Sequence, residues 1–315
     1  MATDLCVLYE HPEWQKPLFA ALERRRVPFE AFDLKSATFD VDLVPTAKLY
    51  FNQASPSAYV RGHTRSVPFA LSFMRTLEIA GARVLNGSPA FAMELSKSAQ
   101  GAMLKKLGIA HPRSLAFNDV RAVAKAWTQF PALLKPEQGG SGARMFLLES
   151  QAELEKTLEL TPNLWEPDHL LLMQEHFEVD PARGIVRMEF LGGELLYAMR
   201  VVSHGAFNLC PSEVCNPSDG SDAACHIPET KPAKPVEFFP FPEVPSEAVA
   251  EGRAIVKACS LDVGGIEYLE AKDGRRIFYD INANSNLRPA IAQAFGFDPF
   301  ERVVDFLVGE LAKQG

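Results

Sequence analysis

The segment Gly264–Asn286 constrains the fold more than any other part of the chain, because its pattern predicts a β-hairpin. Asp273-Gly274 lies between two alternating runs rich in β-branched and aromatic residues, and this dipeptide is a strong signal for a two-residue turn. With the turn placed there, the predicted facing pairs are Lys272 with Arg275, Leu269 with Phe278, and Glu267 with Asp280. Side chains alternate along a strand, so Asn282 shares a face with Asp280.

The facing carboxylates of this hairpin point to a metal. Two carboxylates directly opposite each other repel and destabilise a hairpin. A bound hard cation removes the repulsion, and Mg²⁺ prefers oxygen ligands, commonly one or two carboxylates together with substrate phosphates. The hairpin therefore predicts a divalent-metal site at Glu267, Asp280 and Asn282, and the metal in turn suggests a nucleotide.

Length, composition and charge narrow the class of protein. The chain has 315 residues, 47% of them hydrophobic, which suits two or three subdomains of a globular protein. The formal net charge of −8 argues against a general nucleic-acid binder, whose binding face is normally basic. No run approaches the ~18 apolar residues of a membrane span, and the first residues do not resemble a secretory signal. We therefore expect a cytoplasmic enzyme with reduced cysteines.

Two patterns of secondary structure follow each other along the sequence. Up to about residue 95, short apolar strands alternate with helices, which predicts a mostly parallel sheet. Beyond it, strands are joined by turn signals such as Gly192-Gly193, which predicts antiparallel sheet. Residues 203–246 are rich in Pro, Cys, Ser and Asp, and we expect a long irregular excursion there. The expected units, in a mixed α/β and α+β chain, are residues 1–95, 96–178 and 179–315.

A glycine-rich loop follows a lysine at the end of an apolar strand. Lys135 ends the strand, and Gly139, Gly140, Ser141 and Gly142 form the loop. Glycine lets backbone N–H groups approach phosphate oxygens without interference from Cβ. The loop has neither the GK[ST] of a Walker A motif nor a G-x-G-x-x-G that opens a helix. A flexible hairpin tip with an exposed lysine explains the same residues, since glycine-rich turns are common.

Two further segments fit a nucleotide site without requiring one. The strand that begins at Leu170 has a polar exit, Gln174-Glu175-His176-Phe177, which could offer backbone groups to an adenine edge. A plain buried strand is the alternative. Arg187 and Arg200 lie on the two arms around Gly192-Gly193. An arginine suits a transferring phosphoryl or acyl-phosphate oxygen, but the solvent face of a sheet fits the same spacing.

Taken together, these pieces resemble the ATP-grasp superfamily, and most of all its ribosomal-protein glutamate ligase and glutathione synthetase group. The resemblance covers about residue 96 to the C-terminus, in family order. It implies roles for residues of this chain as follows: Lys97 and Lys135 as the ATP-binding lysines, Gly139–Gly142 as the phosphate-covering loop, Gln174, Glu175, His176 and Phe177 as the adenine linker, Arg187 and Arg200 as the phosphate-side arginines, Asn208 near the γ-phosphate, and Glu267, Asp280 and Asn282 as Mg²⁺ ligands.

The resemblance implies the ATP-grasp fold and an ATP-dependent carboxylate–amine ligase. Mg²⁺-ATP, for which Mn²⁺ could substitute as the metal, would phosphorylate a carboxylate to an acyl phosphate that an amino acid or peptide amine attacks. Relatives are often homodimers or homotetramers. A kinase that stops at the phosphorylated product and a nucleotide-binding partner module without turnover are the alternatives. Where relatives continue the metal strand with proline and glycine, this chain reads Asn282-Ala283-Asn284-Ser285-Asn286, which puts the usual amine acceptors in doubt.

Three other groups of residues are candidates for binding. Asn284, Ser285 and Arg288 follow the metal strand, where relatives face the acceptor substrate. Arg61, His63 and Arg65 form a basic cluster after a strand and could hold the carboxylate substrate, or could equally be a solvated loop. Cys210, Cys215 and Cys225 could hold a structural Zn²⁺, but their spacing is not a paired C-x2-C pattern, and reduced thiols packed under the loop are favoured.

Overall fold

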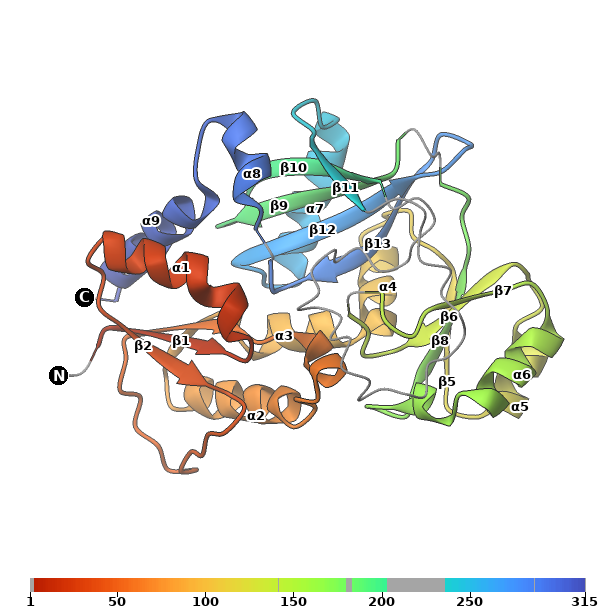
Figure 1. Ribbon diagram of the computed structural model, residues 1–315, viewed down its shortest axis with the longest axis horizontal. Coiled ribbons are helices and arrows are strands. Elements are labelled where there is room, and N and C mark those ends of the chain that lie inside the picture. The colour runs from red at the N-terminus through yellow and green to blue at the C-terminus, as the bar shows by residue number, and fades with distance from the viewer. Residues whose placement is uncertain (1–2, 141, 180–182, 203–235, 286, 315) are drawn as a thin grey trace.

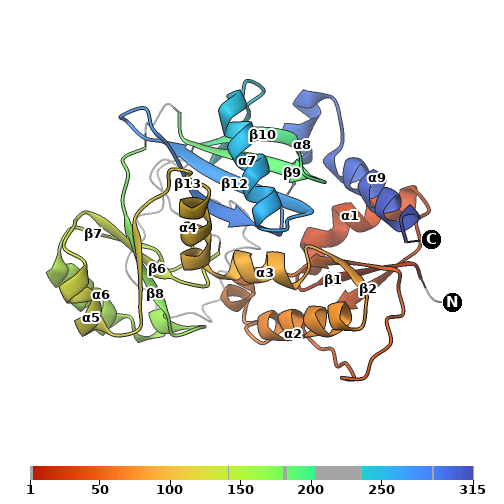
Figure 2. The same cartoon turned by 180° about the vertical axis from the view of Figure 1, so that it is seen from behind.

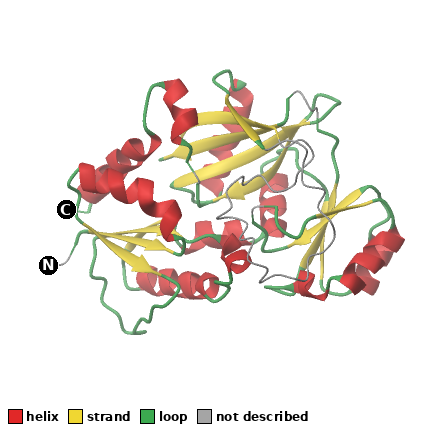
Figure 3. Ribbon diagram, viewed as in Figure 1, coloured by secondary structure: helices red, strands yellow, loops and turns green. Residues whose placement is uncertain are grey.

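Three β-sheets organise the protein in a computed structural model that describes residues 3–140, 142–179, 183–202, 236–285 and 287–314 (Figures 1 and 3). One sheet is parallel and two are antiparallel, as the two sequence patterns predict. The expectation of a mixed α/β and α+β fold is therefore confirmed. Within the described residues, no helix is long and apolar enough to cross a membrane.

The parallel sheet has the strand order β2-β1-β3-β4. Helices cover both of its faces, because side chains that alternate along β1 enter two separate cores. The C-terminal helix α9 returns to this sheet and packs beside α1 (Figure 1). Between the two helices, Arg24 pairs with Glu301 at 2.6 Å. The elements of this region are β1 (Leu5–Tyr9), α1 (Pro12–Arg24), β2 (Phe29–Asp33), β3 (Leu49–Gln53), η1 (Pro56–Arg61), α2 (Ser66–Ile79), β4 (Arg83–Leu85), α3 (Ser88–Leu95) and α9 (Pro299–Ala312).

The second sheet has the order β5-β8-β6-β7 and is antiparallel throughout. Its core lies between one face of the sheet and the two helices α5 and α6, and Trp127 is fully buried there. The elements of this region are α4 (Lys97–Lys106), β5 (Ser114–Phe117), α5 (Val120–Ala126), β6 (Ala132–Pro136), β7 (Phe146–Leu148), α6 (Gln151–Leu160), η2 (Pro162–Trp165) and β8 (Leu171–Glu175).

The third sheet has the order β11-β10-β9-β12-β13. Helices α7 and α4 pack on one face, the face turned away from the viewer in Figure 1 and toward the viewer in Figure 2. The other face is turned to the first two sheets. The elements are β9 (Ile185–Leu191), β10 (Glu194–Val202), β11 (Glu237–Pro240), α7 (Ser246–Ala258), β12 (Val263–Glu270), β13 (Arg276–Asn282), α8 (Pro289–Ala292) and η3 (Gln293–Phe295).

Strand β11 corrects one expectation. Residues 203–246 were predicted to be irregular, but Glu237–Pro240 pairs with the outer edge of β10. Its aromatic residues, which include Phe238, supply the β propensity that the proline-rich composition hides. Residues 203–235 lie outside the described part of the chain.

The β12–β13 hairpin keeps the predicted facing of Glu267 and Asp280, but it reaches that pairing by a different route. The loop has three residues rather than two, because the Ala271 N–H donates to the Arg275 carbonyl and Gly274 takes a φ of +86°. Lys272 therefore does not face Arg275, and Leu269 faces Ile277 instead of Phe278. A β-bulge at Tyr279 then restores the register, so that Glu267 lies opposite Asp280.

Candidate active site

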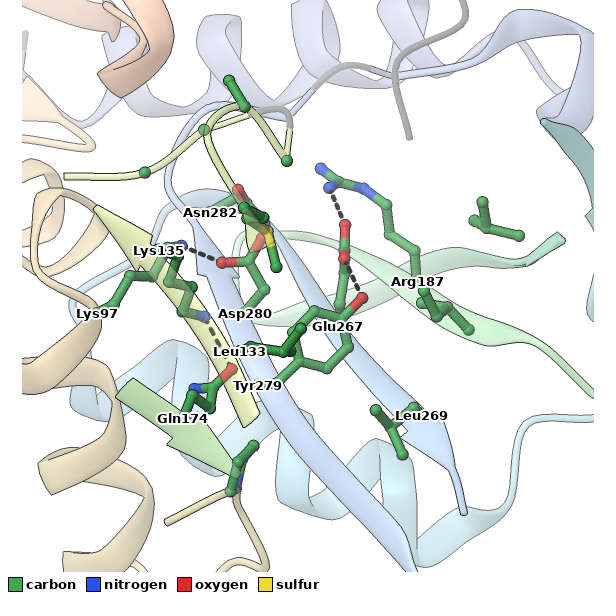
Figure 4. Close-up of a pocket in the computed structure, with 18 of the residues that line it drawn as sticks. Lys97, Leu133, Lys135, Gln174, Arg187, Glu267, Leu269, Tyr279, Asp280 and Asn282 are labelled. Atoms are coloured by element: carbon green, nitrogen blue, oxygen red, sulfur yellow. Dashed lines mark hydrogen bonds and ion pairs between the residues drawn. The ribbon is translucent and has the colours of Figure 1, made fainter. Parts of the chain in front are cut away.

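A cavity of about 740 Å³ lies between the three sheets. Its walls come from α1 and η1 of the first region, β6 and β8 of the second, and β9, β12 and β13 of the third. Most of the residues that sequence analysis singled out line this single space, although they are far apart in the chain (Figure 4).

Two lysines stand on the wall formed by α4 and β6. Lys97 is the first residue of α4, and Lys135 lies in β6, where its Nζ donates to Gln174 Oε1 at 2.9 Å (Figure 4). Burial and, to a smaller degree, the nearby Lys97 charge lower the pKa of Lys135 to about 8. A buried ammonium group beside another cation favours an anionic ligand, because the ligand would offset both the desolvation and the repulsion.

Glu137 holds the two lysine-bearing segments together. Its buried carboxylate accepts hydrogen bonds from the backbone N–H of Ser98, at 3.0 and 3.1 Å, and from the Ser96 hydroxyl at 2.5 Å. The carboxylate thus satisfies one free N–H group of the first turn of α4 and interacts favourably with the positive end of the helix. As a result, the position of Lys97 is tied to the exit of the strand that carries Lys135.

The hairpin β12–β13 presents Glu267, Asp280 and Asn282 to the cavity, directly across from the lysines (Figure 4). Asp280 pairs with Lys97, and the Asn282 amide nitrogen donates to Asp280 at 3.1 Å. Burial alone would raise the pKa of Asp280, but the Lys97 charge lowers it below its ordinary value. Glu267 is more deeply buried, and burial raises its pKa in spite of the adjacent Arg187.

The donor set of this hairpin fits a hard divalent cation. Two carboxylates and an amide provide oxygen ligands, and the Asn282 nitrogen is turned toward Asp280 and the Gly265 carbonyl, which leaves the amide oxygen for a cation. Each carboxylate also pairs with a cationic side chain, Asp280 with Lys97 and Glu267 with Arg187. A bound cation and the phosphates of a nucleotide could take over these charge interactions, the cation at the carboxylates and the phosphates at Lys97 and Arg187. Within the described residues, no group of three or more His, Cys, Asp and Glu side chains could hold a metal.

Arg187 of β9 lies on the cavity side and pairs with two carboxylates. Its Nη1 donates to Glu267 at 2.7 Å, and its Nε donates to Glu189 at 2.6 Å. The guanidinium lies against Gly265, where a Cβ would stand only 2.2 Å from Nη2. A Cβ at this position of β12 would therefore displace the guanidinium from Glu189 and Glu267.

The glycine-rich loop leans on the first region. A Cβ at Gly140 would lie 2.6 Å from the Ser57 Cβ, and Gln138 Nε2 donates to the Pro56 carbonyl at 3.2 Å. Gly139, Gly140 and Gly142 all line the cavity, whereas Ser141 lies outside the described residues. The loop and η1 thus form one wall together.

The far end of the cavity is more apolar. Gln174, Glu175, His176 and Phe177 line it, as expected for the exit of β8. Leu133, Leu147, Ile185 and Leu269 supply aliphatic surface nearby. Aliphatic surface beside the amide of Gln174 is suited to a flat heterocycle.

The structure does not bring Arg200 into the cavity. A bulge at Leu196 shifts the β9–β10 register by one, so Arg187 lies opposite Met199 and Arg200 points to the other face. There its Nη1 is 3.3 Å from Glu270, and its guanidinium stacks 4.0 Å from the Phe241 ring centroid. Asn208 and the cysteines Cys210, Cys215 and Cys225, and with them the zinc hypothesis, lie outside the described residues.

The basic cluster near η1 is also placed differently from the expectation. Arg61 is nearly fully buried: it pairs with Glu10 at 2.5 Å, donates to Ser57 at 3.0 Å and lies under the Trp14 ring. It supports the cavity wall instead of facing a substrate. His63 pairs with the same Glu10, and Arg65 is exposed.

The segment after β13 does reach the cavity. Asn284 donates to the carbonyls of Gln53 and Ala54 at 2.9 and 3.1 Å, so it connects the end of β13 to the parallel sheet. Ser285 donates to Glu189. Arg288 lies 3.5 Å above the Phe238 ring and lines the cavity, with no carboxylate paired to it among the described residues.

Sequence reasoning missed several cavity residues. Trp14 stacks on His11 with ring centroids 4.5 Å apart. Glu94 is buried at the end of α3, and burial raises its pKa to about 8. Tyr279 donates to Glu267 at 2.7 Å. No local pattern marks Trp14 or Glu94, whereas the three-residue spacing of the core residues Phe278 and Ile281 indicates that the alternation breaks near Tyr279.

No protein-family model matches the chain, and no curated protein matches it in sequence. Solved structures do match it over nearly its whole length. The ATP-grasp ligase PsnB, complexed with a minimal precursor, has 17% identity and a TM-score of 0.67 over 100% of both chains. The D-cycloserine synthetase DcsG has 14% identity and a TM-score of 0.68 over 98% of this chain and 99% of its own.

A third match is the VanG D-Ala:D-Ser ligase from Enterococcus faecalis, with 14% identity and a TM-score of 0.66 over 99% of this chain and 100% of that one. Identities this low carry information about architecture, and all three matches agree on it across the full length. Three sheets that enclose one cavity, with two lysines facing an acidic hairpin, are the arrangement found here. The chain therefore has the ATP-grasp fold.

Proposed function

We propose that the chain is an ATP-dependent carboxylate–amine ligase that forms an amide or peptide bond through an acyl phosphate. The observation that carries the proposal is the arrangement inside one cavity of Lys97 and Lys135 across from Glu267, Asp280 and Asn282. Such a set of cations and oxygen donors suits a metal–nucleoside triphosphate. The solved structures with this fold include several ligases, which supports the same reaction class.

In this reaction, different residues of the cavity would have different roles. ATP, when bound with Mg²⁺, supplies the phosphoryl group that activates the substrate carboxylate. Lys97 and Lys135 would hold phosphate oxygens, and the hairpin carboxylates with Asn282 would hold the metal. Arg187 would stabilise charge at the acyl phosphate, because phosphoryl transfer depends on positioning and charge neutralisation. The glycine-rich loop, resting on η1, would keep water from that intermediate.

The substrates would occupy the rest of the cavity. Gln174–Phe177 would receive adenine. Arg288, half-buried and without a carboxylate partner among the described residues, would hold an anionic group of the carboxylate or amine substrate. We propose that the three units 1–95, 96–178 and 179–315 meet around the reacting groups. PsnB was solved with Mg and ADP and with a precursor peptide, so peptides belong beside amino acids among the substrates to be tried.

One assay tests the proposal. The protein is incubated with Mg²⁺-ATP and a panel of carboxylic acids, with and without amino acids and peptides, while ADP and phosphate are followed. ADP release that requires the amine is the expected result. A stable phosphorylated acid formed without any amine would make the protein a kinase, and tight ATP binding without turnover on the whole panel would make it a binding module.

Asp280→Asn provides the matched control for that assay. The variant keeps the size and shape of the side chain but removes the negative charge that the metal requires. We expect turnover to fall by about a hundredfold or more while the fold is retained, as judged by circular dichroism. Full activity of Asp280→Asn would refute the metal assignment.

A further inference from the structure

The bulge in β13 changes which side chains face the cavity. In a regular ladder, Tyr279 would point away from the side of Asp280. Because Tyr279 and Asp280 both stand opposite Glu267, the two side chains emerge on the same face, and both line the cavity. The preceding Phe278 consequently enters the opposite core, where its ring packs 5.2 Å from that of Tyr268.

The tyrosine hydroxyl meets one oxygen of a proposed metal ligand. Tyr279 donates to Glu267 Oε2 at 2.7 Å, while Arg187 Nη1 donates to Oε1 at 2.7 Å (Figure 4). With one donor on each oxygen, the Glu267 carboxylate cannot rotate without losing a hydrogen bond. Each oxygen keeps a further lone pair for a metal.

We infer that Tyr279 is a positioning residue of the metal site, whose hydroxyl fixes Glu267 while its ring forms the adjoining wall of the nucleotide cavity. This role rests on the proposed function and deepens it, because it joins metal and nucleotide binding through one side chain. Ligands of a metal are oriented by their outer hydrogen bonds, and loss of such a bond commonly weakens metal affinity by about ten- to a hundredfold.

The chain offers a matched control for this hydroxyl. Tyr268 is the next residue after Glu267 on β12, is fully buried in the opposite core, and its hydroxyl has no hydrogen-bond partner among the described residues. Tyr268→Phe therefore removes the same atom, close to the same carboxylate in the chain, without removing a hydrogen bond to it.

The test measures Mn²⁺ binding by the paramagnetic signal of the free ion, in the presence of ADP, for the full-length protein. Tyr279→Phe is expected to raise the Mn²⁺ dissociation constant about tenfold, while ADP affinity without metal changes less than about twofold because the ring remains. Tyr268→Phe is expected to leave both unchanged. Unchanged or tighter Mn²⁺ binding by Tyr279→Phe would overturn the inference.

A double-mutant cycle separates a role through Glu267 from a general structural role. In a Glu267→Ala background, Tyr279→Phe should have almost no further effect on Mn²⁺ affinity, because the side chain that accepts the tyrosine hydroxyl is already absent. Equal effects in both backgrounds would overturn the inference while leaving the ligase proposal intact. Failure of the wild-type protein to bind Mn²⁺ with ADP would instead refute the proposed metal–nucleotide site, and this role with it.

Discussion

Glu94 leads to the sharpest prediction about stability. It lies at the end of α3 with only 2% of its surface exposed, and its Oε1 accepts the Asn284 N–H at 3.3 Å. Its Oε2 has no hydrogen-bond partner among the described residues. Burial raises the pKa of Glu94 from 4.5 to about 8, although Lys97 acts in the opposite direction. The folded protein therefore keeps this carboxyl protonated at pH values where the unfolded chain has lost the proton.

The sign and size of the effect follow from proton linkage. Between pH 4.5 and about 8, the folded state binds more protons at Glu94 than the unfolded state, so stability falls as pH rises. The slope approaches about 1.4 kcal/mol per pH unit. Glu94→Gln keeps the acceptor for the Asn284 N–H but never ionises, so its stability does not fall with rising pH for this reason. The free energy of unfolding of the variant, relative to wild type, should rise by about 3.5 kcal/mol between pH 4.5 and 7.5, because the slope is below its maximum near each pKa.

Urea unfolding at half-unit steps between pH 4.5 and 8 measures this difference. Glu159→Gln, at an exposed position of α6, serves as the control for replacing a carboxylate at the surface. A constant gap between Glu94→Gln and wild type across the whole range would refute the reasoning. It would mean that Glu94 is ionised in the folded protein or is equally protonated in both states.

Two further predictions concern the cavity walls. Burial and Lys97 lower the pKa of Lys135 to about 8, so the affinity for ADP, measured by calorimetry, should weaken above pH 8 by up to about tenfold per pH unit. Lys135→Arg stays charged and should lose much of that pH dependence. An equal slope of ADP affinity against pH in both proteins would contradict the role of Lys135 in binding phosphate. Gly265→Ala places a Cβ 2.2 Å from Arg187 Nη2 and should lower the free energy of unfolding by about 1–3 kcal/mol, because it disturbs the hydrogen bonds of Arg187 to Glu189 and Glu267. The control Gly309→Ala, whose Cβ would have nothing within 4 Å, should be neutral or slightly stabilising. Equal thermal stability of the two variants would refute the crowding at Gly265.

Local patterns predicted most of the elements that carry the site. Short strands that alternate with helices were expected up to about residue 95, and the parallel sheet β2-β1-β3-β4 lies there. The turn at Gly192-Gly193 is also confirmed, with φ of +59° and +88°. These features depend on residues close in sequence, such as caps, turns and alternating hydrophobic runs. The contacts that assemble the cavity depend on residues far apart.

Long-range contacts explain what was missed. Gly140 meets Ser57, Glu94 meets Asn284, and Arg61 lies under Trp14, and no spacing in the sequence relates the members of these pairs. Arg61 is an example: the sequence predicted that this basic residue holds a substrate, but in the structure it forms an ion pair with the buried Glu10. A buried carboxylate requires a charged or hydrogen-bonding partner, and the fold, rather than the local pattern, decides which cation supplies it.

Two single-residue bulges determine which side chains face the cavity, and neither bulge was predicted. At Leu196 the extra residue sends Arg200 to the far face, and at Tyr279 it brings a tyrosine beside Glu267. A period of two locates a face only while the register is unbroken, and one inserted residue exchanges the faces beyond it. The alternation of hydrophobic residues does record the second bulge, since Phe278 and Ile281 both enter the same core although they are three apart. A spacing of three between core residues in a strand is therefore the sequence signal from which Tyr279 could have been predicted to face the cavity.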